Sequence, residues 1–200
     1  MARGIAAIRK AQLGEPPLLS GRFIRGVKGS SSTLNLSVLG IDPGLERTGY
    51  AVLSAPAHRI VEAGVIRSSP KDSLPVRLAE LTVGIDEVLN EHAVDLVAVE
   101  DLFAHYKHPR TAILMGHARG VVLLAAARRG IEVVNLLPTR VKKALTGNGH
   151  AGKAQMQRAI SATLKLTRLP EPSDVADALA IAWCAAVERV ELRTRNGGRI

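Results

Sequence analysis

Aromatic residues and cysteine are scarce in this chain of 200 residues. Aromatic side chains make up 2% of it although 46% of the residues are hydrophobic, so its core must consist of aliphatic side chains and alanine. The single cysteine, Cys184, excludes an intramolecular disulfide and a cysteine-based zinc site, and it fits a reducing compartment. No apolar run approaches the roughly 18 residues that a transmembrane helix needs.

Negative charge is missing from particular stretches of the chain, whose formal net charge is +9. Residues 1–35 contain six basic residues and one acid, and residues 102–170 contain twelve basic residues and one acid. Residues 36–101, by contrast, contain five basic and eleven acidic residues. Because Lys and Arg neutralise phosphates and release their counterions, the basic half suggests a polyanionic partner. A solvated surface with two cationic tails is the alternative interpretation.

Both ends of the chain lack a periodic apolar pattern. Residues 1–35 are predicted to be a basic, disordered tail; a DNA-binding arm, an organellar targeting peptide and a misassigned start codon are alternatives. Residues 191–200 are predicted to be a basic C-terminal tail. The folded domain is therefore expected at residues 36–190.

Hydrophobic periodicity within this domain predicts an antiparallel meander followed by alternating helices and strands. This order predicts an α/β fold, a mixed five-stranded sheet flanked by α-helices. The strands are expected at residues 36–42, 48–54, 59–68, 95–100 and 131–136, and the helices at 74–92, 109–129, 138–145, 153–166 and 173–190.

Two acids stand at the ends of strands that should be central. Asp42 ends the apolar run LSVLGID, and Glu100 ends DLVAVE. A carboxylate in this position is held rigidly at the edge of the sheet; an Asx turn at Asp42 and a surface acid at Glu100 are the competing interpretations. Asp101 follows directly, and since side chains alternate along a strand, only one of these two acids can face Asp42. Glu100 is preferred.

Two further acids, Asp174 and Asp177, begin the last predicted helix, where their spacing places them on one face. The helix dipole accounts for Asp174, but it explains Asp177 less well because the helix beyond is apolar. Clustered carboxylates repel each other unless cations are present, and hard oxygen ligands suit Mg²⁺ or Mn²⁺. Two such ions about 4 Å apart can activate a water and stabilise the leaving oxygen of a phosphodiester. A metal-dependent nuclease is therefore predicted.

Five stretches, in order over about residues 36–188, resemble the RuvC family of Holliday-junction resolvases. They are LGIDPGLERTGY, VAVEDLF, GHARGVVLLAA, the KAQMQ stretch and SDVADALAIA. The resemblance implies an RNase H-like fold and a homodimer that binds four-way junction DNA. It implies Mg²⁺-dependent, symmetric nicking of that DNA during recombination and repair. It also implies a cytoplasmic, nucleoid-associated enzyme, with a branch-migration motor as a candidate partner and no membrane partner.

The resemblance also implies roles for individual residues. The four acids Asp42, Glu100, Asp174 and Asp177 would be catalytic and would hold two Mg²⁺ ions, which Mn²⁺ could replace, with Asp42 bridging them. Lys153 would stabilise the charge developing on the phosphate. Phe103 matches an aromatic residue that stacks on a base, with a simple core or rim position as the alternative, and the helix at 109–129 matches the family's dimer-forming helix. The candidate DNA contacts are Phe103, Lys107, Arg110, Arg119, Lys142, Lys143 and Lys153.

The sequence departs from the family's usual pattern in two places. Some 35 residues precede the first strand, and Asp101 adds a negative charge beside Glu100. The alternative functions are a related RNase H-like nuclease acting on RNA or other branched DNA, a non-catalytic junction-binding module and an actin-like ATPase. The intact acids argue against the binding module. The ATPase fold needs two strand–Asp–Gly-turn halves, and this chain contains one.

Overall fold

Three apolar strands form the predicted antiparallel meander. They are β2 (Leu36–Asp42), β3 (Arg47–Ala55) and β4 (Arg59–Arg67), with β3 between the other two. Asp42 lies opposite Gly49 because the two strands join through a short turn. These elements belong to a computed structural model that describes residues 6–8, 35–102 and 109–195.

Two parallel strands extend this meander on its β2 side. β5 (Leu96–Glu100) pairs with β2, and β6 (Glu132–Leu136) pairs with β5. The crossover connections contain α1 (Leu74–Glu91) and α2 (Pro109–Arg128). The result is the mixed sheet predicted from the sequence, with the five expected strands in the order β4-β3-β2-β5-β6.

A sixth strand and a longer last helix were not predicted. β1 (Ala6–Ile8) pairs antiparallel with β4 inside the stretch expected to be a tail. Three residues are too few to show a hydrophobic period. α5 (Ser173–Arg195) runs five residues past its predicted end at Val190. Arg189, just before that predicted end, forms an ion pair with Glu132 on β6.

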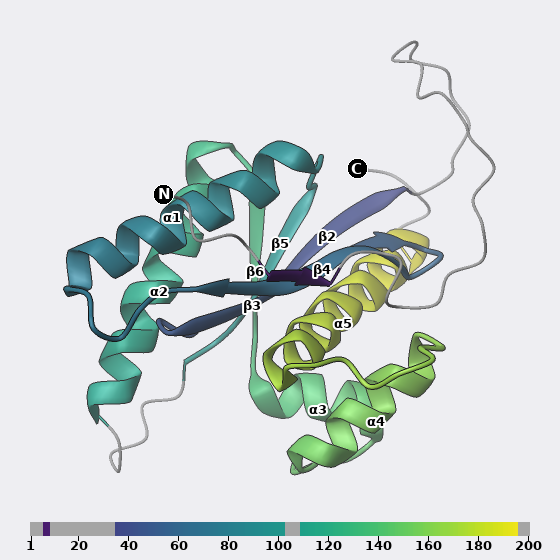
Figure 1. Ribbon diagram of the computed structural model, residues 1–200. Helices are drawn as coiled ribbons and strands as arrows, with labels where there is room; N and C mark the ends of the chain where they lie inside the picture. Colours follow the sequence, from purple (N-terminus) through teal and green to yellow (C-terminus); the bar gives the residue numbers. More distant parts are fainter. Residues whose placement is uncertain (1–5, 9–34, 103–108, 196–200) are drawn as a thin grey trace.

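The helices cover both faces of the sheet, as Figure 1 shows: α1 and α2 lie on one face, and α3 (Pro138–Thr146), α4 (Lys153–Thr163) and α5 lie on the other. Alternation along the strands supplies a core to each face. Ile41 and Tyr50 are buried toward α1 and α2, while Val38 and Leu53 are buried toward α5. None of the helices in the described residues is both long and apolar enough to span a bilayer.

Two glycines allow α5 to rest directly on the sheet backbone. A Cβ atom on Gly40 of β2 would overlap the carbonyl oxygen of Ala178 and the backbone nitrogen of Ala182. One on Gly49 of β3 would overlap the carbonyl oxygen of Asp174. The first turns of α5 are therefore held against the ends of β2 and β3, which is where Asp42 lies.

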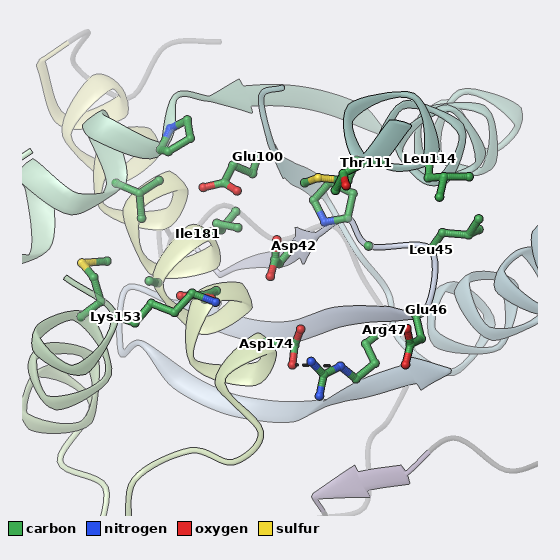
Figure 2. A pocket seen from close by; sticks show the side chains of 18 of the residues that line it. Asp42, Leu45, Glu46, Arg47, Glu100, Thr111, Leu114, Lys153, Asp174 and Ile181 are labelled. Carbon is green, nitrogen blue, oxygen red and sulfur yellow. Dashed lines mark ion pairs between the residues drawn. The ribbon is translucent and has the colours of Figure 1, made fainter. Parts of the chain in front are cut away.

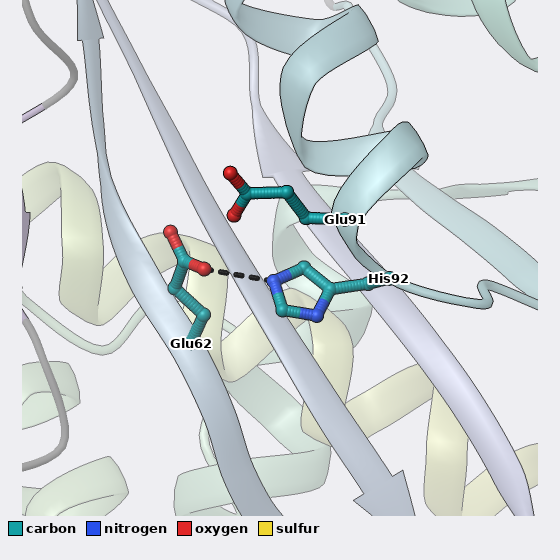
Figure 3. Close-up of side chains that lie close together, drawn as sticks. All are labelled: Glu62, Glu91 and His92. Carbon is teal, nitrogen blue, oxygen red and sulfur yellow. Dashed lines mark hydrogen bonds and ion pairs between the residues drawn. The ribbon is translucent and has the colours of Figure 1, made fainter.

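A group of polar residues joins β4 to the end of α1 (Figure 3). We call Glu62, Glu91 and His92 the Glu62 cluster, because their potential ligand atoms all lie within 4.8 Å of one another. The buried Tyr50 hydroxyl donates a hydrogen bond of 2.6 Å to Glu62. The other carboxylate oxygen of Glu62 lies 2.7 Å from Nε2 of His92. These bonds tie the C-terminal end of α1 to the sheet.

Candidate active site

Four carboxylates converge at one edge of the sheet, where they line a cavity of about 770 Å³ (Figure 2). Asp42 and Glu100 end β2 and β5, which are parallel neighbours paired through Ile41 and Val99, so both acids emerge at the same edge. The start of α5 brings two more acids to this edge. We call Asp42, Glu100, Asp174 and Asp177 the acid cluster; all four are partly buried and line the cavity.

The turn that follows Asp42 is fixed by two side-chain hydrogen bonds. The buried Thr48 hydroxyl donates to the carbonyl oxygen of Gly44 at 2.6 Å. The Ser68 hydroxyl donates to the carbonyl oxygen of Leu45 at 2.5 Å, and the Ser68 backbone N–H donates to Glu46. These bonds join β3 and the residue after β4 to the turn. They therefore fix the backbone that directly follows Asp42.

Burial and mutual repulsion raise the pKa of three of these acids. Desolvation, followed by the charges of Glu100, Asp177 and Asp174, raises the pKa of Asp42 to about 8, against the opposing effect of Lys153. Desolvation and then Asp177 raise the pKa of Glu100 to about 7, although Lys142 and Lys153 lower it. Desolvation also raises the pKa of Asp177. The four acids thus form one electrostatically coupled group with a surplus of negative charge.

The acid cluster fits a divalent cation. Its ligands are hard carboxylate oxygens, which suit Mg²⁺ and Mn²⁺. Oδ2 of Asp174 is buried and accepts no hydrogen bond from the described residues, an arrangement that costs free energy unless a cation or a water satisfies it. Within the described residues, the acid cluster does not form a group as compact as the Glu62 cluster. Wider spacing is expected of like charges, which repel each other.

Cationic side chains stand on both sides of the acid cluster. Lys153 begins α4 and Lys142 lies on α3, and both line the cavity. Arg110, at the start of α2, lines it from the opposite side. Three of the predicted DNA contacts therefore border the acids.

The other predicted contacts lie elsewhere. Lys143 is exposed but does not line the cavity. Arg119 is mostly buried and donates a 2.7 Å hydrogen bond to Asn135. Phe103 and Lys107 lie outside the described residues.

Asp101 faces away from the cavity, as strand alternation predicts. Its Oδ1 accepts a hydrogen bond from the backbone N–H of Leu102 at 3.0 Å and lies 3.5 Å from the Arg119 guanidinium. Asp101 does not line the cavity, whereas Glu100 does. The charge of Asp101 is therefore paired with Arg119 outside the acid cluster, and Glu100 alone of these two acids belongs to the cluster.

Two arginines in the cavity wall were not predicted from the sequence. Arg47 begins β3 and Arg77 lies in the first turns of α1. Nε of Arg77 donates to the Ser68 hydroxyl at 3.1 Å, which positions its guanidinium at the rim. Both residues fall in the acid-rich half of the chain, where the overall charge pattern gives no reason to expect a phosphate-facing cation.

The mixed sheet and the acids at the ends of its adjacent parallel strands β2 and β5 place the chain in a class, the RNase H-like nucleases. A family model described as crossover junction endodeoxyribonuclease RuvC matches residues 38–185. The chain therefore belongs to the RuvC family. This membership confirms the resemblance read from the five sequence stretches and removes the actin-like alternative.

Relatives and solved structures agree with this assignment. The chain is 59% identical over 149 residues to a crossover junction endodeoxyribonuclease RuvC of Rhodopirellula baltica, covering 74% of this chain and 84% of the relative. It is 41% identical over 165 residues to the protein of that name from Desulforamulus reducens, covering 82% and 98%. Thermus thermophilus RuvC in complex with a Holliday junction substrate superimposes with a TM-score of 0.71 at 36% identity, covering 78% of this chain and 96% of the other.

Proposed function

We propose that the protein is a structure-selective endonuclease that resolves four-way DNA junctions by Mg²⁺-dependent, symmetric nicking. The observation that carries this proposal is the acid cluster: four carboxylates from β2, β5 and α5 meet in one cavity with cationic walls. The choice of substrate rests on a relative, Thermus thermophilus RuvC, whose structure is in complex with a Holliday junction substrate. The proposed setting is recombination and repair of chromosomal DNA in the cytoplasm, beside the nucleoid.

The proposed chemistry is hydrolysis of a phosphodiester by water. Asp42, Glu100, Asp174 and Asp177 would hold two Mg²⁺ ions, with Asp42 shared between them. Such ions would activate a water and offset negative charge on the phosphate.

The lysines of the α3–α4 wall complete the proposed site. The ammonium groups of Lys142 and Lys153 lower the pKa of Glu100 and so already act on the cavity. In this position they would attract the scissile phosphate and stabilise the charge that grows on it in the transition state.

A homodimer would present two such sites to a junction with two-fold symmetry. Support comes from α2, on which Ile113 is 61% exposed and Leu124 is 60% exposed. Apolar side chains exposed on one helix are typical of a surface that a second copy covers. A motor that migrates the junction remains a predicted partner.

A substrate panel tests the function. The protein should cleave a mobile four-way junction with Mg²⁺, should spare duplex, flap and RNA substrates, and should cleave nothing in EDTA. Preferential cleavage of flaps or RNA would instead support the related-nuclease alternative. Junction binding without cleavage in Mg²⁺ or Mn²⁺ would support the non-catalytic one.

A further inference from the structure

One member of the acid cluster faces a cation at close range. Nε of Arg47 lies 3.7 Å from Oδ2 of Asp174 (Figure 2), too far for a hydrogen bond but close enough for charge attraction. The Asp174 side chain is 17% exposed and the Arg47 side chain 47%. The buried carboxylate oxygen is therefore attracted to a side chain that reaches it from the solvent side, and it accepts no hydrogen bond from any described residue.

The backbone fixes this encounter. Gly49 of β3 contacts the backbone of Asp174, so the first turn of α5 cannot shift along the strand. Arg47 lies two residues before Gly49 and so faces the same side of the sheet. Asp174 is held in place by main-chain contacts, whereas the guanidinium of Arg47 sits at the end of a long side chain that can turn away.

A second arginine makes this position costly for Arg47. Arg67 of β4 lies directly opposite Arg47 in the antiparallel register. Like charges at directly opposite positions of a sheet destabilise the pair. Arg67 does not line the cavity. Arg47 and Arg67 thus place two positive charges on adjacent strands beside the cavity, which suits an anionic ligand.

We infer that Arg47 is the counter-charge of the metal-free site: it competes with a divalent cation for Asp174 and, once displaced, binds a backbone phosphate of the DNA strand. The inference rests on the proposed function. A cation ligated by Asp174 takes over the neutralising role of Arg47. The freed guanidinium, already at the cavity rim, presents a planar fork of donors that matches a phosphate.

Arg47 is thus a positioning residue that links metal occupancy to substrate binding. In the metal-free protein it partly neutralises the acid cluster. In the loaded protein it adds a phosphate contact on the wall opposite Lys142 and Lys153. This exchange makes metal binding and DNA binding favour each other. Metal binding frees Arg47 to contact the phosphate, and DNA binding draws Arg47 away from Asp174.

The test measures Mn²⁺ affinity by electron paramagnetic resonance on the full chain, without DNA. Arg47→Gln should bind Mn²⁺ roughly 2–5-fold more tightly than the wild type, the range that a half-exposed ion pair allows. Arg67→Gln is the matched control, since it removes the same charge from the neighbouring position but no partner of Asp174. Its gain should be smaller. An unchanged or weaker affinity in Arg47→Gln, or equal gains in both variants, would overturn the inference.

Junction binding in Ca²⁺ supplies the second measurement. Arg47→Gln should bind the junction more weakly and should reduce the slope of log affinity against log salt by about 0.9, the value for one phosphate contact. Arg47→Lys keeps the charge and should restore most of that slope. An unchanged slope in Arg47→Gln would contradict the phosphate contact.

The wild type and Asp42→Asn separate this inference from the proposed function. If the wild type shows no Mn²⁺ binding that depends on Asp42, the proposed function fails and the inference falls with it. If that binding is present but insensitive to Arg47, the inference alone is wrong.

Discussion

The acid cluster and the Glu62 cluster both contain partly buried carboxylates, and they differ in whether those carboxylates have partners. In the Glu62 cluster, Glu62 accepts one hydrogen bond from Tyr50 and is paired with His92, so the most buried carboxylate is already compensated. In the acid cluster, desolvation and like charges raise the pKa of Asp42, and a buried oxygen of Asp174 accepts no hydrogen bond from the part of the chain that the structure describes. Compactness alone would select the wrong group. Uncompensated charge marks the group that needs a ligand.

The two clusters should differ most when one acid in each is neutralised. Asp42→Asn should lower the rate of junction cleavage on the order of 10³-fold, because a metal site supplies several kcal/mol of transition-state stabilisation. Glu62→Gln should leave cleavage nearly unchanged. Single-turnover cleavage and junction binding should be measured separately. Cleavage retained by Asp42→Asn would contradict the assignment, and so would lost binding with intact cleavage.

A smaller effect is expected when the support beneath the acid cluster is altered. Gly49→Ala forces a methyl group against the backbone of Asp174 and should lower the free energy of unfolding by about 3 kcal/mol. Cleavage should fall as well, because α5 carries two of the acids. Gly152→Ala is the control: an added Cβ meets nothing within 4 Å and the φ of −77° suits any residue, so stability should change by less than about 1 kcal/mol. Urea denaturation measures both, and similar values for the two would argue against the close approach.

The Glu62 cluster should matter for stability alone. Glu62→Ala removes the acceptor of the buried Tyr50 hydroxyl and should cost about 2 kcal/mol of unfolding free energy without changing cleavage. Glu91 is exposed and makes no hydrogen bond in the described part of the chain, so Glu91→Ala should change stability by less than about 0.5 kcal/mol. A loss of activity in Glu62→Ala that exceeds its loss of folded protein would give this cluster a functional role.

The metal-free protein should show a pH dependence of its stability. The folded pKa of Asp42 is raised from 3.8 to about 8, so the folded state holds this proton more tightly than the unfolded state. The free energy of unfolding should therefore fall as pH rises between these values. Each kcal/mol that is lost should lower the melting temperature by about 2–4 °C.

The contribution of Asp42 is complete below its unfolded pKa and is lost above its folded pKa. Mg²⁺ should restore the melting temperature near pH 8, and Asp42→Asn should flatten the profile in EDTA. Melting curves from pH 5 to 9 measure this. A profile in EDTA that rises with pH would contradict the raised pKa.

Local patterns in the sequence were sufficient to predict most helices and strands and to select the four acids. Asp42 and Glu100 each end a continuous apolar run, which is enough to predict a strand and the rigid placement of its last side chain. Gly147, whose φ of 75° suits glycine, ends α3 where the sequence marks a loop. β1 was missed because three residues carry no period, and the true end of α5 was missed because its last turn is charged rather than apolar.

The contacts that make the cavity could not be predicted in this way. Ser68 holds the turn after Asp42 from 23 residues away, and it also positions Arg77 on another element. Arg47 meets Asp174 only because Gly49 lets α5 rest on β3. None of these pairings follows from the spacing of residues along the chain.

The sequence by itself determined which acids stand at the ends of rigid elements, because hydrophobic periodicity and strand length depend on neighbouring residues. It also determined the family, because five stretches occur in order. Only the tertiary structure decided that these acids share one cavity and that arginines from the acid-rich half complete the wall. Those outcomes depend on strand order and on how closely α5 approaches the sheet, and both are set by contacts between residues far apart in the chain.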